Sequence, residues 1–125
     1  IEADDIPELW ASKMQDYLGV DTAGNFDHGC LQDIHWPAGM FGYFPSYTLG
    51  AMYAAQYFAT IRNLHPNLDS LIAAGDLSPV MNWPDTNIWS QASRWSTDAL
   101  VTRATGESLN ATYLRKHLET RYLAG

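Results

Sequence analysis

The chain of 125 residues has little cysteine and little positive charge. Its one cysteine, Cys30, excludes an internal disulfide. Seven lysines and arginines stand against fourteen acidic residues, which gives a formal net charge of -7. Because nucleic acids and anionic membrane surfaces are bound through clustered basic side chains, we expect neither as a partner.

We expect no secretory leader, and the middle of the chain has no charged side chains. The first seven residues carry three acids and no apolar core, so with the single cysteine we expect a cytoplasmic protein. Residues 34–61 carry no Lys, Arg, Asp or Glu, and this uncharged stretch is long enough for a membrane span. His35, Pro37 and Pro45 make that span costly, and we expect a helix buried inside a protein larger than this chain.

No run alternates apolar and polar residues long enough for a strand, so the predicted fold class is all-α. Capping residues, glycines and apolar spacing predict the helices. The first two are residues 6–18, capped by Asp4 or Asp5, and residues 47–64, capped by Ser46; a short helix follows between Asn67 or Asp69 and Gly75. The next runs from Ser78 towards Trp95, and Pro84 should cause a break or kink in it near Asn82. The last two are residues 96–104, ended by Gly106, and residues 111–123, capped by Asn110. Without a repeat or linker, we expect no second domain boundary.

The histidines do not have the spacing of a metal site. His28, His35, His65 and His117 form neither H-x-x-x-H nor H-E-x-x-H, so we expect no zinc ligands in this chain. It also has no G-x-S-x-G elbow of a serine hydrolase and no glycine-rich loop ahead of a strand.

The most specific segment is Gln32-Asp33-Ile34-His35-Trp36. Asp33 and His35 are two residues apart, which in extended backbone places both on one side, where the carboxylate can fix the imidazole's tautomer. Such a pair is either part of a functional site or a polar contact that ties a loop to the core. The residue types alone leave both readings open.

Tyr43 and Tyr47 follow this segment and are four residues apart. If the helix begins early they share a face, and their hydroxyls can point into the same cleft as His35. A phenol is a good neutral donor to a tetrahedral intermediate. The competing interpretation is that both are core aromatics.

Gly29-x-x-Gln32-Asp33-x-His35-Trp36 resembles the G-x-x-Q-D-x-H-W signature of the carboxypeptidase Taq family of zinc metallocarboxypeptidases. Three more segments resemble that family in order: I-P-E-L-W, then G-M-F-G-Y-F-P-S-Y-T-L-G, which is similar to F-G-Y-F-P-T-Y-x-L-G, and A-T-G-E-S-L. The sequence departs from the pattern where the family tends to carry I-H-x-H-G, since residues 88–92 read I-W-S-Q-A.

The resemblance implies a helical bundle-like C-terminal portion of a larger helical metallopeptidase fold, with residues 1–125 as a single segment that lacks the zinc-binding part. The H-E-x-x-H helix and its glutamate partner would precede Ile1, and zinc or cobalt would bind there in the full-length enzyme. That enzyme would release single C-terminal amino acids from peptides. The resemblance assigns His35 to substrate binding and oxyanion stabilisation, Tyr43 and Tyr47 to donation to the tetrahedral intermediate, and Gln32 and Asp33 to positioning.

We therefore expect the chain alone to be inactive and to form a homo-oligomer, because faces built to meet the missing part would be exposed. The alternative is a non-catalytic helical protein-binding module that keeps the cleft wall without the chemistry. A membrane-associated helical protein is a third possibility.

Overall fold

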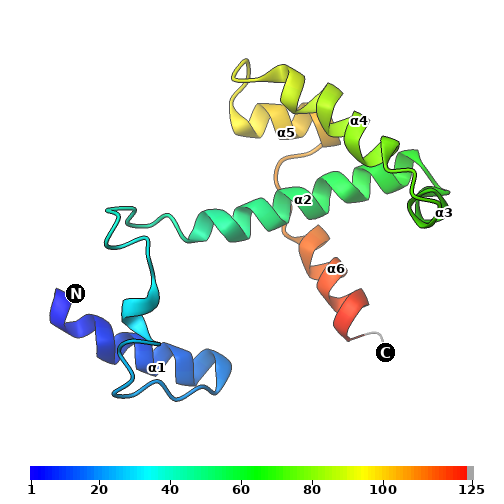
Figure 1. Ribbon diagram of the computed structural model, residues 1–125. Helices are drawn as coiled ribbons and strands as arrows, with labels where there is room; N and C mark the ends of the chain where they lie inside the picture. The colour runs from blue at the N-terminus through cyan, green and yellow to red at the C-terminus, as the bar shows by residue number, and fades with distance from the viewer. Residues whose placement is uncertain (124–125) are drawn as a thin grey trace. The chain divides into compact units, whose positions relative to one another are not determined.

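The computed structural model describes residues 1–123, and within that range every regular element is helical (Figure 1). The α-helices are α1 (Ile6–Leu18), α2 (Pro45–Leu64), α3 (Leu68–Ala73), α4 (Ser78–Asn87), α5 (Thr97–Thr105) and α6 (Thr112–Tyr122). Short 3-10 turns lie at Ala3–Asp5, Cys30–Gln32 and Trp89–Gln91. The predicted all-α class is confirmed. Across residues 1–123, no helix is long and apolar enough to cross a membrane.

The chain divides into two compact units, Ile1–Phe44 and Pro45–Gly125. The first unit contains α1 and the loops that follow it. Pro7 lies in the first turn of α1, where its missing N–H costs no hydrogen bond. Gly19 ends the helix in the left-handed conformation (φ 67°), and its N–H donates to the carbonyl of Gln15 at 3.0 Å. The predicted helix 6–18 is confirmed.

In the second unit, α2 begins two residues earlier than expected. Pro45 is its first residue, so Ser46 lies inside the first turn and is not the cap. Proline suits a first helical position because its φ is already helical. The apolar core of this unit is formed by Ile61, Leu68 and Trp83.

A buried glutamine joins α2 to the segment between α5 and α6. Gln56 is 1 % exposed, and its amide nitrogen donates to Thr105 Oγ1 at 2.8 Å and to the carbonyl of Ser108 at 3.2 Å. Its side-chain oxygen accepts the backbone N–H of Asn110 at 2.8 Å. Because both ends of the amide are bonded, the polar group is buried without an unsatisfied atom.

Of the break or kink expected near Asn82, the break does not occur, because α4 is continuous from Ser78 to Asn87 with Pro84 in its interior. The helix stops at Asn87, short of the expected Trp95, and a 3-10 turn follows. After that turn Ala92 adopts φ 47° and ψ -135°, a conformation that side chains rarely tolerate.

The expected capping residues are confirmed for α5, whereas the N-cap of α6 is Ala111 and not the expected Asn110. Ser96 Oγ accepts the N–H of Ala99 at the start of α5, and Gly106 ends that helix with φ 93°. Asn110 Oδ1 accepts the N–H of Thr112 at 3.0 Å, so α6 begins one residue later than expected.

Candidate functional site

The loop that carries the signature is bound tightly to the chain before it. The backbone N–H groups of Gly29 and Leu31 both donate to the carbonyl of Phe26, at 3.2 and 3.1 Å. A Cβ atom on Gly29 would lie 2.4 Å from the carbonyl oxygen of Asn25, which is closer than real Cβ contacts allow. Glycine is therefore required at this position by space.

Asp33 and His35 contact each other as their spacing predicts. Asp33 has extended backbone (φ -72°, ψ 114°). Its Oδ1 accepts the backbone N–H of His35 at 2.8 Å and lies 2.5 Å from His35 Nδ1. An ionised carboxylate only accepts hydrogen bonds, so this contact assigns a proton to Nδ1.

These hydrogen bonds also set the charge of the carboxylate. The backbone N–H of His35 is the main cause that lowers the pKa of Asp33 below its usual 3.8, and the ring contact lowers the pKa further. Asp33 is therefore ionised at neutral pH beside the imidazole.

Aromatic side chains hold the imidazole in a buried position. His35 is 8 % exposed. Its ring stacks on Tyr43 with centroids 5.4 Å apart and an interplanar angle of 25°, and meets Phe44 at 5.6 Å and 88°. The first unit thus brings Asp33, His35 and Tyr43 together.

The other two predicted site residues are more exposed. Gln32 lies in the 3-10 turn Cys30–Gln32 and is exposed. Tyr47 is in the first turn of α2, in the second unit, and is 58 % exposed. Tyr43 precedes α2, so the condition under which the two tyrosines would share a helical face is not met.

Residues 1–123 contain no group of three or more His, Cys, Asp or Glu side chains that could hold a metal ion. His35 has one carboxylate next to it, which is too few ligands for a zinc site. The described residues therefore do not fit a metal, and no step through a metal is assigned to them.

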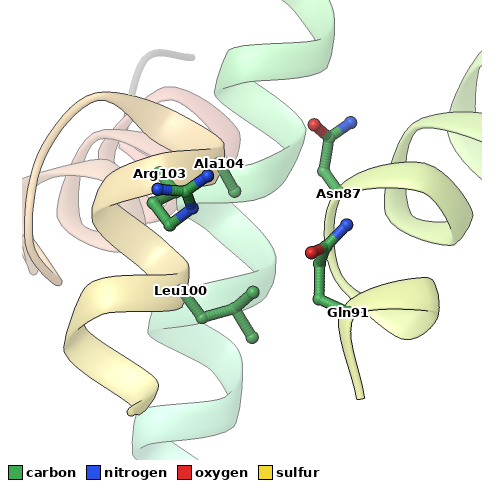
Figure 2. A pocket seen from close by; sticks show the side chains of 5 residues that line it. All are labelled: Asn87, Gln91, Leu100, Arg103 and Ala104. Atoms are coloured by element: carbon green, nitrogen blue, oxygen red, sulfur yellow. The ribbon is translucent and has the colours of Figure 1, made fainter. Parts of the chain in front are cut away.

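A small polar cavity of about 130 Å³ lies in the second unit between the α4 end and α5 (Figure 2). Asn87 and Gln91 line one side, and Leu100, Arg103 and Ala104 line the other. The Asn87 amide nitrogen donates to the carbonyl of Trp83, and that of Gln91 to the carbonyl of Thr86. The Arg103 guanidinium lies 4.2 Å from the ring centroid of Trp95.

The sequence analysis did not predict this cavity. Its lining residues come from three separate elements, so they follow no regular spacing in the sequence that could be recognised. The departure at residues 88–92 was the available signal, since Gln91 stands where the family tends to carry histidine.

The family profile described as "Carboxypeptidase Taq (M32) metallopeptidase" matches residues 1–122. The chain is 40% identical over 124 residues to "Thermostable carboxypeptidase 1" of Thermus thermophilus, covering 99% of this chain and 24% of that protein. It is 40% identical over 122 residues to "Carboxypeptidase 1" of Bacillus subtilis, covering 98% of this chain and 24% of that protein.

Solved structures agree with the sequence relatives. "Trypanosoma Cruzi Metallocarboxypeptidase 1" is similar with a TM-score of 0.94 and 48% identity, covering 98% of this chain and 26% of that one. The M32 carboxypeptidase of Deinococcus radiodurans R1 is similar with a TM-score of 0.91 and 32% identity, covering 98% and 24%. The chain spans about a quarter of the length of the relatives it matches. It belongs to the carboxypeptidase Taq (M32) family of metallopeptidases.

Proposed function

We propose that this chain is the C-terminal part of a zinc-dependent metallocarboxypeptidase and supplies the substrate-binding, oxyanion-stabilising wall of its cleft. The complete enzyme would release single C-terminal amino acids from peptides. The observation that carries the proposal is the double contact of Asp33 Oδ1 with the backbone N–H and ring Nδ1 of His35. A hydrogen bond at Nδ1 orients the imidazole so that Nε2 can contact substrate.

The arrangement supports His35 as a donor to a developing oxyanion. In that role Nε2 would carry the donated proton, while Nδ1 donates to Asp33 Oδ1. A preoriented donor in a place with little water is worth far more than the same donor in water. Stacking on Tyr43 and the edge contact with Phe44 fix the ring plane, so little reorganisation is needed during reaction.

The remaining roles follow the family resemblance. Tyr43 is 45 % exposed and Tyr47 58 % exposed, so substrate can reach both, and their hydroxyls would donate to the tetrahedral intermediate. Gln32 would position substrate, and Asp33 positions His35. Zinc or cobalt, held by polypeptide outside these 125 residues, would polarise the scissile carbonyl and activate water.

We further propose a soluble cytoplasmic homo-oligomer that acts on peptides and binds neither nucleic acid nor membrane. The support is the low content of basic residues and the many large apolar side chains that are exposed, among them Leu31, Ile34 and Phe41.

The second candidate is a non-catalytic helical protein-binding module. The burial of the His35 ring favours it, because the Asp33 and His35 contacts would then serve only to hold the loop. Under that function the ring never touches substrate.

Kinetics of the longer protein that carries the metal-binding part distinguish the two functions. We expect His35→Gln to lower kcat by about 100-fold while metal content is unchanged, the loss typical of one oxyanion donor. His28→Gln, an exposed histidine in the same unit, is the matched control and should keep kcat. If His35→Gln lowers the melting temperature but leaves kcat intact, His35 has only a structural role, and the protein-binding module replaces the proposed catalytic function.

A further inference from the structure

Arg103 supplies the positive charge of the cavity between the α4 end and α5 (Figure 2). Its guanidinium lies 4.2 Å from the ring centroid of Trp95, so the aromatic ring holds the planar group in place. Among the residues that the structure describes, no carboxylate lies within ion-pair distance of Arg103. Because a guanidinium carries only N–H donors, this group favours a ligand with an anionic acceptor such as a carboxylate.

Two side-chain amides on the opposite side of the cavity point their oxygen atoms toward α5. The amide nitrogen of Asn87 donates to the carbonyl of Trp83 at 2.9 Å, and that of Gln91 donates to the carbonyl of Thr86 at 3.1 Å. These bonds turn both nitrogens away from α5, and Figure 2 shows both oxygens on its side. In the described part of the chain, neither oxygen accepts a hydrogen bond. Two carbonyl oxygens placed in this way favour a ligand with N–H donors.

The size of the cavity and the charge of the chain restrict the ligand further. The volume of about 130 Å³ is well below the roughly 300–1,000 Å³ of sites for drug-sized molecules, so the ligand has few heavy atoms. The net charge of -7 opposes a free anion but not a molecule whose own charges cancel. Leu100 and Ala104 add a short apolar wall. A small zwitterion with a short apolar side chain meets all of these conditions.

We propose that this cavity binds a small free α-amino acid of the size of glycine or alanine. Its carboxylate accepts hydrogen bonds from the Arg103 guanidinium, and its ammonium group donates to the side-chain oxygens of Asn87 and Gln91. Such a molecule is of the class that the proposed carboxypeptidase would release. Identifying the ligand as a product of the enzyme therefore rests on the proposed function, whereas the binding itself does not.

NMR titration of the isotope-labelled chain tests the site residue by residue. L-Alanine should shift the side-chain N–H signals of Arg103, Asn87 and Gln91 and saturate with a Kd on the order of 1 mM. Acetate lacks the ammonium group and alaninamide lacks the carboxylate, so each should bind roughly tenfold more weakly or worse. Equal binding by acetate would identify a simple anion site and overturn the proposal. Absence of a saturable shift at about 100 mM L-alanine, about 100 times the expected Kd, overturns it as well.

A pair of arginine variants separates this cavity from other places where an amino acid can bind. Arg103→Met removes the guanidinium but keeps an apolar stem, and it should weaken L-alanine binding by roughly tenfold or more. Arg94→Met removes an exposed arginine from the loop before α5 and is the matched control, which should bind as the parent does. Circular dichroism shows whether both variants fold. Parent-like binding by Arg103→Met contradicts the assignment.

The intact longer protein that carries the metal-binding part provides the last measurement. L-Alanine should raise its melting temperature, because a ligand that binds only the folded state stabilises that state, and Arg103→Met should reduce the rise. If L-alanine binds the chain but not the longer protein, other polypeptide fills the cavity there and the proposal is overturned. A longer protein that binds L-alanine at this site but releases no amino acid from peptides contradicts the proposed function and leaves the site standing.

Discussion

Gln56 and Asn110 are 54 positions apart, yet the side-chain oxygen of Gln56 accepts the backbone N–H of Asn110 at 2.8 Å. The same side chain donates to Thr105 and Ser108, so one buried amide fixes the course of the chain between α5 and α6. We expect Gln56→Met to lower the free energy of unfolding by about 2 kcal/mol, because a buried backbone N–H and a carbonyl lose their partner. Urea titration measures the loss. Gln15→Met, on the exposed side of α1, is the control and should change little.

Ala92 holds a conformation that suits glycine, with φ 47° and ψ -135°. We expect Ala92→Gly to stabilise the protein by about 1 kcal/mol, because the strain of a side chain in this region disappears. Ala54→Gly, at a helical position, should instead destabilise by about 1 kcal/mol. Thermal melts of both variants measure whether Ala92→Gly raises and Ala54→Gly lowers the melting temperature. A melting temperature for Ala92→Gly at or below that of the parent contradicts the strain argument.

The two hydrogen bonds of Asp33 can be separated by substitution. Asn at position 33 keeps an oxygen for the backbone N–H of His35 but loses the charge beside Nδ1, whereas Ala loses both contacts. We therefore expect Asp33→Ala to lower the melting temperature of the first unit more than Asp33→Asn. In the longer enzyme, both variants should lower kcat, and equal activity of Asp33→Asn and the parent would remove Asp33 from the positioning role.

Glu107 makes the stability of the second unit depend on pH. The Tyr113 hydroxyl donates to one carboxylate oxygen at 2.6 Å, and the Asn110 amide donates to the other at 3.0 Å. The Tyr113 bond is the main cause that lowers the pKa of Glu107 below 4.5, and the same bond raises the pKa of Tyr113 above 10.0.

The sign of this dependence follows from the two shifts. The Glu107 contribution to stability is complete above pH 4.5 and is lost as the pH falls through its lower native pKa. The Tyr113 contribution is complete below pH 10.0 and is lost as the pH rises through its raised native pKa. Tyr113→Phe should move the Glu107 titration, followed by carboxyl NMR, back towards 4.5. An unchanged midpoint contradicts the assigned cause.

The sequence predicted those features that depend on local chemistry. Pro7 and Gly19 predicted the ends of α1, and Ser96 and Gly106 predicted those of α5, because caps act within a few residues. The contact between Asp33 and His35 was predictable for the same reason. The family was recognised from the spacing of the signature residues.

Features that depend on tertiary packing were not predictable. Pro84 does not break α4, since the core around Trp83 holds that helix together. Gln56 gave no signal in the sequence, because its partners lie 49 to 54 residues away. The cavity beside Arg103 is assembled from three separate elements. Burial of the His35 ring depends on Tyr43 and Phe44 folding back over it.

The crowding at Gly29 affects how the signature should be used to identify active enzymes. Any side chain there would collide with the Asn25 carbonyl, whether or not the protein has a reaction to catalyse. A descendant that lost hydrolysis would still be selected to keep this glycine for the sake of folding. Under the role proposed for His35, retention of this histidine in related genes would distinguish active from inactive proteins better than retention of Gly29.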